Sequence, residues 1–541
     1  MNTAILKKLS LPFFAALSLT LAGCGTETNN TNNGEGAGTQ QTNENGEGAE
    51  TVEFRDELNI AMTAQPPSLD APRTASNVAI NIAAHIFEPL FSMNENYEVT
   101  PDLALGYEVS VDGLVYTITL REGIMFHDGS ELTAADAVAS MNRWLLVNGR
   151  AGNALAGSVF EQVDDYTLTL TLEQPFGDVM QIMASRATFA IIMPEELALE
   201  LDEDGAPAVL ETFIGTGPYE FNEWRQDQFI HLTRFEAYEP RGEVASGFSG
   251  MRAAYTPNLF FHFVSDVNTR ISGLRTGQFD IAEDIPFENA SDLQNADGIN
   301  LHTRNAGILN AFFNTTEGIL SDPQIRHAIL AGMNNEEIMI GGYSSTDYFT
   351  LNHGFTNPSQ QQWAVDAGVD AYNQNNQDLA RELLAASDYN GETIRLLTTR
   401  DYISMHNATV VLDAQLRALG FETEIINVDF PSFMERRSTT TDWDIFITSN
   451  GYNILPTQIL ALDPNWAGFD SEFVAQAIQD VRLAPTQEAA TEAWAGLVGY
   501  VYENAAFTPI GHFKNAMATS DQVEGFVFFD HPVYWNARIP R

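Results

Sequence analysis

The sequence predicts an α/β protein with more than one hydrophobic core. The chain has 541 residues, of which 44% are hydrophobic, and this is enough apolar material for several cores. Residues 103–143 combine two strands of alternating polarity, joined by a turn at Asp112 and Gly113, with a helix that begins at Thr133. Residues 166–172 alternate in the same way and add a further strand. Strands and a helix therefore share one stretch of chain.

The helix after Thr133 carries a local start signal. Asp136 lies three residues later and completes an acidic variant of the capping box. Val138, Met141 and Leu145 follow at a spacing that places them on one helical face. The segment therefore predicts a strand, a turn, a second strand, a loop and a capped helix that faces a core.

The order of residues in 103–143 resembles the solute-binding proteins of peptide and nickel ABC importers. Their pattern runs roughly LA…W.VS.DG..YTF.LR.G..FHDG..LTA.DV..S..R, and this chain reads LALGYEVSVDGLVYTITLREGIMFHDGSELTAADAVASMNR without a gap. The resemblance covers essentially all of residues 53–541. It implies a two-lobed periplasmic-binding-protein fold (class II-like, cluster C) with an extra subdomain, about residues 100–214, inserted in lobe one.

The same resemblance predicts the division of the chain. Lobe one spans residues 53–308, lobe two spans 309–508, and 509–541 return to lobe one. We expect the first crossing near residues 305–309 and the second near 509–511. Two crossings form a hinge, and a ligand is trapped in the cleft when the lobes close.

The first 24 residues predict a lipoprotein signal peptide. Lys7 and Lys8 precede an apolar run at 9–22 that is too short to span a bilayer comfortably, and the sequence Leu-Ala-Gly-Cys ends at Cys24. Residues 1–23 are then removed, and the thiol of Cys24 carries the lipid. An ordinary signal peptide with an accidental cysteine is the alternative. Because Cys24 is the only cysteine, the chain holds no internal disulfide and no cysteine metal site.

Residues 24–52 are rich in Asn, Thr, Gly, Gln and Glu and contain almost nothing apolar. Such a segment buries too little surface to offset its ordering entropy. We therefore expect a disordered tether between the lipid anchor and the folded protein.

The charge is strongly acidic, with a formal net value of −47. After the signal peptide the only lysine is Lys514, and the other cations are arginines. This field repels nucleic acid and anionic lipid headgroups, which argues against both as partners. The surface could attract cations, but we favour a solvated surface suited to high external salt, where the screening length shrinks to ~3 Å at 1 M.

No motif in the sequence predicts catalysis. It contains no Gly-x-Ser-x-Gly, no His-Glu-x-x-His and no His/Cys cluster at metal spacing. The Gly-x-Gly at Gly215 and Gly217 lacks the further glycine or lysine of a phosphate-binding loop, so we interpret it as structural. His127 is interpreted as a structural hydrogen-bonding residue. We therefore predict no catalytic residue, no metal site and no cofactor.

Two candidate ligand contacts come from lobe-two and lobe-one loops of the resembled family. In its dipeptide-binding members an Arg and a Tyr two residues later help to hold the carboxylate end of the ligand, and Arg400 and Tyr402 match both. A guanidinium suits a carboxylate because it can bind it bidentately. The first ligand-facing loop of the family falls at Thr74, Ser76 and Asn77.

The third candidate segment is Asn450, Gly451, Tyr452 and Asn453. Peptide-binding relatives read Gly-Trp-…-Asp-Tyr-Pro-Asp-Pro here, and one Asp pairs with the free amino group of the peptide. This chain has no carboxylate at residues 453–455. A buried ammonium without a countercharge is costly. We therefore expect an anionic ligand without a standard free amine, such as a modified peptide, an opine-like conjugate or a glycoside.

The resemblance implies a non-enzymatic, monomeric binding protein of an ABC importer. It would be held at the outer face of the cell membrane through Cys24, capture a peptide or peptide-like small molecule, and deliver it to permease and ATPase subunits. A surface sensor or chaperone-like protein is one alternative. A binder of chelated nickel or haem is another, although no His-rich cluster favours direct metal ligation.

Overall fold

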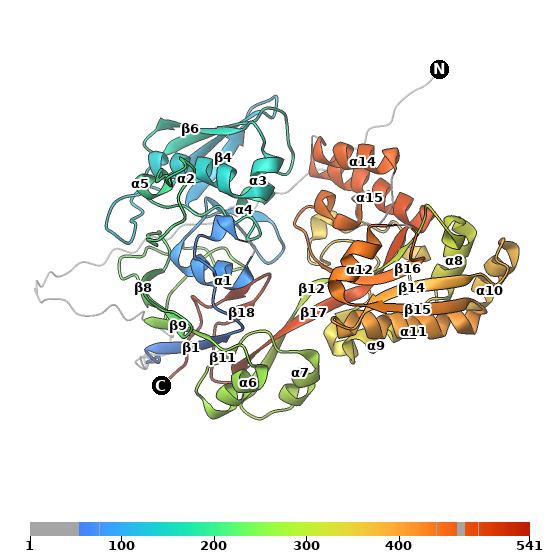
Figure 1. The fold of residues 1–541 in the computed structure, drawn as a ribbon. Helices are drawn as coiled ribbons and strands as arrows, with labels where there is room; N and C mark the ends of the chain where they lie inside the picture. Colours follow the sequence, from blue (N-terminus) through green and yellow to red (C-terminus); the bar gives the residue numbers. More distant parts are fainter. Residues whose placement is uncertain (1–52, 75, 440, 463–470, 485) are drawn as a thin grey trace, which may run out of the picture. The chain divides into compact units, whose positions relative to one another are not determined.

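A mixed sheet of eleven strands runs through the molecule (Figure 1). The computed structural model describes residues 53–541 except 75, 440, 463–470 and 485, so the predicted signal peptide, Cys24 and the tether lie outside the described residues. The strands, in sheet order, are β15 (Glu422–Val428), β14 (Thr393–Thr399), β16 (Ile445–Gly451), β12 (Ile299–Phe313), β17 (Phe507–Ser520), β11 (Ile281–Ala282), β1 (Glu57–Met62), β10 (Asn258–Phe263), β9 (Phe229–Arg234) and β8 (Tyr219–Arg225), with β13 (Phe349–Thr350) beside β17.

The long strands β12 and β17 join the two lobes. They pair antiparallel from Ile299 with Ser520 to Phe312 with Phe507. The first half of β12 lies opposite the part of β17 that also pairs with β11, in lobe one. The second half lies between β17 and β16, in lobe two. Lobe one therefore holds β1 and β8–β11, lobe two holds β13–β16, and both lobes share one sheet.

The pairing of β12 with β17 is irregular where the chain passes between lobes. Register shifts fall between Asn305 and Gly307 and between Leu309 and Asn310. A Cβ on Gly307 would lie 2.2 Å from the carbonyl oxygen of Asn450, so only glycine fits this close approach of β12 and β16. Both shifts fall within residues 305–310, which include the stretch 305–309 in which the first crossing between lobes is predicted. In β17, pairing with lobe-two strand β13 continues to Phe513, beyond the predicted 509–511.

A separate four-stranded antiparallel sheet lies in lobe one, within the segment predicted as an extra subdomain. Its order is β4 (Ala104–Val109), β5 (Val115–Leu120), β7 (Thr167–Thr171) and β6 (Val159–Asp164). The alternation predicted for the strands is confirmed, because Tyr116, Ile118 and Leu120 are buried. The capping box of Thr133 and Asp136 is also present at the start of α2.

The helices surround the sheets. Those of lobe one are α1 (Asn77–Ile86), α2 (Ala134–Val147), α3 (Gly149–Ala154), α4 (Val179–Ala184), α5 (Glu195–Ala198), α6 (Val267–Thr276) and α7 (Phe287–Gln294). Those of lobe two are α8 (Pro323–Gly332), α9 (Asn335–Tyr343), α10 (Gln377–Ala386), α11 (Ile403–Leu419), α12 (Phe430–Arg437), α14 (Glu472–Arg482) and α15 (Gln487–Asn504). Two short hairpins, β2 (Phe91–Met93) with β3 (Val99–Pro101) and β18 (Val527–Phe528) with β19 (Pro532–Val533), complete lobe one.

Several predicted helix ends are confirmed in atomic detail. Asp322 caps α8 through the amide of Gln324 at 2.8 Å, and Pro323 occupies the first turn. Gly277 and Gly420 end α6 and α11 in the left-handed conformation. These ends fix where each helix meets its neighbouring loop.

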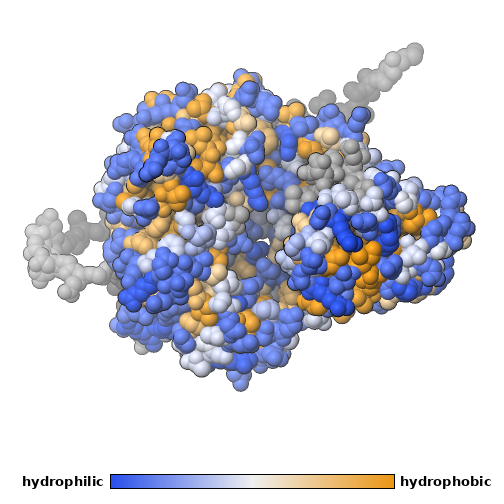
Figure 2. Space-filling view, in the orientation of Figure 1, coloured by the Kyte–Doolittle hydropathy of each residue, from blue (hydrophilic) through white to orange (hydrophobic). Residues whose placement is uncertain are grey.

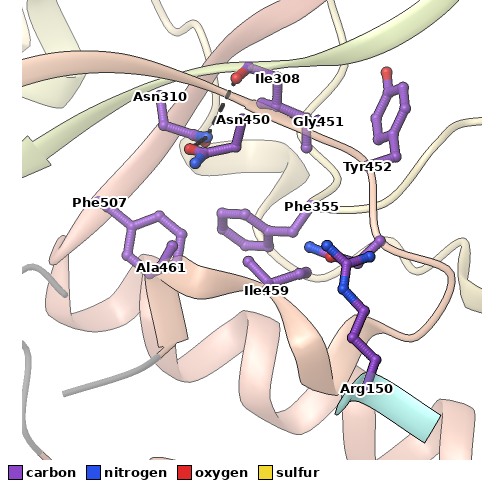
Figure 3. A pocket seen from close by; sticks show the side chains of 11 residues that line it. Arg150, Ile308, Asn310, Phe355, Asn450, Gly451, Tyr452, Ile459, Ala461 and Phe507 are labelled. Atoms are coloured by element: carbon purple, nitrogen blue, oxygen red, sulfur yellow. Dashed lines mark hydrogen bonds between the residues drawn. The ribbon is translucent and has the colours of Figure 1, made fainter. Parts of the chain in front are cut away.

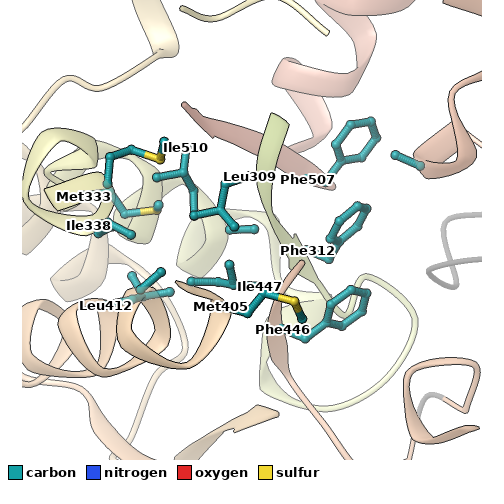
Figure 4. Packing of buried hydrophobic residues seen from close by; sticks show 14 of the residues in the cluster. Leu309, Phe312, Met333, Ile338, Met405, Leu412, Phe446, Ile447, Phe507 and Ile510 are labelled. Carbon is teal, nitrogen blue, oxygen red and sulfur yellow. The ribbon is translucent and has the colours of Figure 1, made fainter. Parts of the chain in front are cut away.

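The core of lobe two packs on both faces of the shared sheet (Figure 4). On one face, Phe312 stacks against Phe446 and Phe507, with ring centroids 4.8 and 5.4 Å apart. On the other, Leu309 and Ile447 lie against buried residues of the covering helices. Each face of the sheet is therefore covered, which makes the strands near the cleft a rigid support.

The viewed face of the molecule is mostly hydrophilic, with scattered apolar patches (Figure 2). Among the described residues no helix is long and apolar enough to cross a bilayer.

Candidate functional site

Three adjoining cavities lie between the lobes and share Arg150, Tyr452 and Asn453 in their walls. Two of them measure about 210 Å³ each and the third about 20 Å³. Because the same three residues border all of them, the cavities form one cleft. Its walls come from α3 in lobe one, from the end of β16 in lobe two, and from β12 at the hinge.

The lobe-two wall is the end of β16 and the residues that follow it (Figure 3). Asn450 accepts a hydrogen bond of 3.4 Å from the amide of Asn310 on β12. Tyr452 holds its hydroxyl 2.7 Å from Nδ1 of His512, whose Nε2 lies 3.0 Å from the carbonyl oxygen of Gly354. Because that carbonyl only accepts, Nε2 of His512 carries the proton and Nδ1 accepts from Tyr452. Burial lowers the pKa of His512 to about 4, so this chain of bonds is neutral near pH 7.

The lobe-one wall carries a free cation. Arg150 extends from the short helix α3 toward the segment that contains Tyr452 (Figure 3). Asn148 sets the start of this helix by accepting a hydrogen bond of 3.0 Å from the amide of Ala151. The side chain of Arg150 is exposed, and within the described part of the chain it has no ion pair or hydrogen bond. Its charge is available to whatever enters the cleft.

A second cation lies at the hinge. The guanidinium of Arg304 on β12 stacks on Phe528 at 5.2 Å, and its Nη1 lies 3.8 Å from Oδ1 of Asp530. Its Nε is buried without a partner among the described residues. Arg304 and Asp530 both line the cleft, together with Asn77 and His531. Nη1 also donates to the carbonyl oxygen of Asn305 at 3.1 Å. Because the ion pair with Asp530 is long, the charge of Arg304 is only partly neutralised and can attract a further acceptor.

A buried hydrogen-bonded chain leads from the cleft into lobe one. Nδ1 of His531 lies 2.7 Å from Oδ1 of Asn81, and the amide of Asn81 donates to Glu283 at 3.4 Å. The hydroxyl of Tyr534 also donates to Glu283. Burial raises the pKa of Glu283 to about 7, although these hydrogen bonds act to lower it. Burial also lowers the pKa of His531 to about 4.

The predicted segment from Asn450 to Asn453 and the predicted residue Asn77 all line the cleft. Thr74 and Ser76 do not line these cavities. The hydroxyl of Thr74 accepts from the amide of Ser76 at 3.0 Å, and Ser76 caps α1 through Ala79.

Arg400 and Tyr402 also lie outside the cavity walls. Arg400 is exposed just after β14 ends, and Tyr402 packs against Phe430 with ring centroids 4.6 Å apart. The cleft instead presents Arg150 and Arg304, which sequence reasoning did not select. Neither arginine belongs to a sequence motif. The two lie far apart in the sequence, and only the fold brings them to one cavity.

The apolar residue at the position of the missing carboxylate is buried between the lobes. Leu455 is 1% exposed and belongs to the hydrophobic cluster of the second sheet and α4, which is otherwise made of lobe-one residues. Ile454 packs against the same cluster. Leu455 and Ile454 therefore form an apolar contact between lobe two and lobe one.

The glycines and the histidine interpreted as structural are confirmed in that role. A Cβ on Gly215 would lie 2.2 Å from the carbonyl oxygen of Ile86, and one on Gly217 would lie 2.6 Å from that of His85. His127 lies with its Nε2 3.0 Å from the carbonyl oxygen of Gly217, and its Nδ1 accepts from the amide of Gly215. Within the described residues no group of three or more metal-ligating side chains is found.

A cleft between two lobes that share a sheet is the geometry of a binding protein, and comparison with known proteins decides the family. Residues 98–467, more than half of the chain, match the family model of bacterial extracellular solute-binding proteins, family 5 middle. The chain belongs to this family. Family 5 proteins bind solutes and are not enzymes, and those of ABC importers hand their ligand to the permease and ATPase components.

Individual proteins similar to this chain support its assignment to this family. "Probable peptide ABC transporter periplasmic-binding protein y4tO" of Sinorhizobium fredii is 27% identical over 504 residues, which are 86% of this chain and 90% of that protein. The glutathione-binding protein GsiB of Salmonella typhimurium is 27% identical over 385 residues, 68% of this chain and 69% of that protein. The crystal structure of the ABC transporter substrate-binding protein CtaP of Listeria monocytogenes matches with a TM-score of 0.77 at 19% identity and covers 90% of this chain and 100% of its own.

These comparisons confirm the predicted family and the two-lobed fold. The protein is therefore a bacterial extracellular solute-binding protein of family 5.

Proposed function

We propose that this protein captures an anionic, peptide-like solute in the cleft between its lobes and delivers it to a permease and ATPase. It acts as a monomer at the outer face of the cell membrane, anchored by lipid on Cys24 after removal of residues 1–23. The resident ligand carries at least one carboxylate and lacks a standard free amine at the Asn453 subsite.

The observation that carries the proposal is the charge of the cleft. Arg150 borders all three cavities and has no partner among the described residues, and Arg304 is paired only loosely with Asp530. In a chain with a formal net charge of −47, a pair of accessible guanidinium groups in one cleft marks a site for anions. Guanidinium groups bind carboxylates through charge-assisted, often bidentate hydrogen bonds.

The absence of a carboxylate near Asn453 supports the second part of the proposal. Asn453 lines the cleft with a neutral amide, and Leu455 is buried in the lobe-one cluster. The carboxylate of Asp530 in the same cavity already faces Arg304, so an ammonium group beside Asn453 would lose its hydration without gaining a countercharge of its own. The ligand end that faces Asn453 is therefore blocked or uncharged.

Arg400 and Tyr402 remain candidates for the carboxylate subsite, and variants separate them from Arg150. We expect Arg150→Gln to weaken binding of an acidic ligand at least tenfold, as loss of a charge-assisted hydrogen bond requires. Arg400→Gln tests the site inferred from the family pattern. Arg275→Gln is the matched control, because Arg275 is exposed on α6, away from the cleft.

The experiment begins with the solute that co-purifies with a chain starting after Cys24. The protein is expressed in rich medium, purified at high salt and denatured, and the released molecules are identified by mass spectrometry. Titration calorimetry then measures the affinity of the identified solute for the wild type and the three arginine variants. A single blocked or non-peptide acid supports the proposal. A ladder of peptides with free amino groups contradicts it and identifies an oligopeptide receptor.

A further inference from the structure

A larger cavity, of about 1080 Å³, lies on the other side of α4 from the ligand cleft. One wall is the edge of the second sheet with its turn at Asp112 and Gly113, and the opposite wall is the junction of α14 and α15 in lobe two. The amide of Gly177 donates to the carbonyl oxygen of Arg482 at 3.1 Å and joins the two walls at one edge. Of its lining residues, Tyr97 alone also borders the ligand cleft.

Tyr97 separates the two spaces. Its ring packs against Phe529 with centroids 4.8 Å apart, and its hydroxyl accepts a hydrogen bond of 2.9 Å from the amide of Asn357. The ring is 6% exposed, so the partition is closely packed. The second cavity is therefore a separate compartment and not an open extension of the cleft.

The walls of this cavity combine apolar and aromatic side chains with polar ones. Tyr107, Tyr116 and Phe176 come from lobe one, and Val481 and Leu483 come from lobe two. Tyr107 is 45% exposed and Leu483 is 54% exposed, although both are large and apolar in body. A space of this size lies at the upper end of the range of pockets that hold small organic molecules in proteins.

The charged residues of the lining are all acidic. They are Glu98, Asp112 and Asp178, and no arginine or lysine of the described chain belongs to the lining. The ligand cleft, in contrast, contains Arg150 and Arg304. The cleft also contains Asp530, so its charged lining is mixed, whereas the charged lining of the second cavity is wholly acidic.

Two acceptor atoms in the wall are buried without a donor. Asp178 is 5% exposed and precedes α4 without making a capping bond, and its Oδ2 has no hydrogen-bond partner among the described residues. Oε1 of Gln181, one helical turn later, is buried and unpaired in the same way. Residues three apart on a helix project from the same face, so both acceptor atoms lie on the same side of α4. Buried acceptors without donors are destabilising unless something fills them.

Arg482 only partly compensates for the burial of the Asp178 carboxyl group. Burial raises the pKa of its carboxyl group to about 7, and the attraction of Arg482 lowers it only in part. Asp178 forms no ion pair within the described residues. A cation beside Oδ2 would restore the charge balance that the fold leaves open.

We propose that this cavity is a second binding site, for an organic cation whose ammonium or guanidinium group meets Asp178 and Gln181 and whose apolar or aromatic body lies against Tyr107, Tyr116 and Phe176. The ammonium donates to both unpaired oxygens, and the aromatic faces add cation–π attraction. Since both lobes contribute walls, an occupant stabilises their contact at Gly177 and Arg482. The site is independent of the solute proposed for the main cleft.

The test uses 2-phenylethylamine as the probe and 3-phenylpropionate, of similar size and opposite charge, as its control. Binding to the soluble chain is measured at pH 8 and low salt by saturation-transfer NMR and titration calorimetry. Asp178→Asn removes the buried charge and keeps the shape of the side chain. Asp112→Asn is the matched control, because Asp112 lies on the exposed rim of the same cavity.

We expect the amine to bind and the carboxylate not to bind. Asp178→Asn should weaken amine binding at least tenfold, whereas Asp112→Asn and Arg150→Gln should change it less than twofold. The thermal midpoint of Asp178→Asn should equal or exceed that of the wild type, since the variant loses an unpaired buried charge, and this measurement excludes misfolding as the cause. No binding of the amine, equal binding to Asp178→Asn, or equal binding of the carboxylate overturns the proposal.

Discussion

The side-chain amide of Asn357 in lobe two donates a hydrogen bond of 2.9 Å to the hydroxyl of Tyr97 in lobe one. Asn357 is 4% exposed and Tyr97 is 6% exposed, so this bond between the lobes is shielded from water. A buried amide that loses its acceptor costs about 1–3 kcal/mol. The bond therefore belongs to the closed form and is lost when the lobes separate.

Replacing Tyr97 by Phe should weaken closure. We expect solute affinity to fall about tenfold, because Nδ2 of Asn357 is left unsatisfied only in the closed, ligand-holding form. Calorimetry with the co-purified solute measures the loss. Tyr255→Phe is the control, since the hydroxyl of Tyr255 makes no hydrogen bond among the described residues. Equal affinity of Tyr97→Phe and wild type would show that the bond does not contribute to closure.

A carboxylate at position 453 should change which ligands are accepted. Asn453 lines all three cavities of the cleft, so Asn453→Asp places a negative charge in contact with the solute. We expect dipeptides with a free amino group to gain at least tenfold in affinity, and their N-acetyl forms to gain nothing. Competition calorimetry against both peptide forms measures the difference. No gain for the free-amine peptides contradicts the proposed role of this position.

Truncation of Leu455 should open the protein without unfolding either lobe. Leu455→Ala removes a side chain buried in the lobe-one cluster and should cost about 2 kcal/mol or more in the closed form. Solute affinity should then fall about thirtyfold. Leu199→Ala, at a side chain 58% exposed, is the control and should change affinity little. Small-angle scattering without solute checks the expected increase in the open population.

The buried carboxyl of Glu283 should give a measurable pH dependence. Its pKa in the folded protein is about 7, above the ordinary value of 4.5, mainly because of burial. Between about pH 4.5 and 7 the folded state therefore holds a proton that the unfolded state has released. The contribution of Glu283 to stability falls as pH rises through this window, and it stays low at higher pH. The decrease amounts to about 3 kcal/mol at most.

Glu283→Gln removes this decrease. Relative to the wild type, the variant should gain stability between pH 5 and pH 8, as measured by guanidinium unfolding at both pH values. Glu108→Gln, in an exposed strand position, should show no such gain. If the free energy of unfolding changed equally with pH in the wild type and in Glu283→Gln, the carboxyl group of Glu283 would have its ordinary pKa in the folded protein.

The lipid anchor has a direct test. Cys24→Ala removes the only thiol of the chain, so palmitate labelling of expressing cells should be lost completely. The protein should also move from the detergent phase to the aqueous phase in a Triton X-114 partition, because acyl chains supply the membrane affinity. Continued labelling of the variant would place the modification elsewhere.

Local patterns predicted local structure well. The capping box at Thr133 and the start of α8 at Asp322 depend on residues close in sequence. For His127 only the structural role was predicted, because its partner, the carbonyl of Gly217, lies far away in sequence. The predicted segment 450–453 also lies in the cleft wall, because it follows directly from a central strand of the shared sheet.

The charged residues of the cleft could not be predicted in the same way. Arg150 and Arg304 are ordinary arginines in sequence, and only the fold brings both to the lining of one cavity. Arg400 has the family pattern around it, yet the end of β14 leaves it outside the walls. Similarly, nothing in the sequence marks Asp178, whose importance arises from burial beside a cavity that two lobes form together.

The ladder between β12 and β17 has a consequence for how the protein unfolds. Each strand belongs to both lobes at once, so neither lobe can be excised without cutting two strands in their middle. The lobes should therefore not melt one after the other, as tethered domains do, but in a single cooperative calorimetric transition. A fragment ending near residue 308 would expose half of a ladder and should aggregate through its open edge.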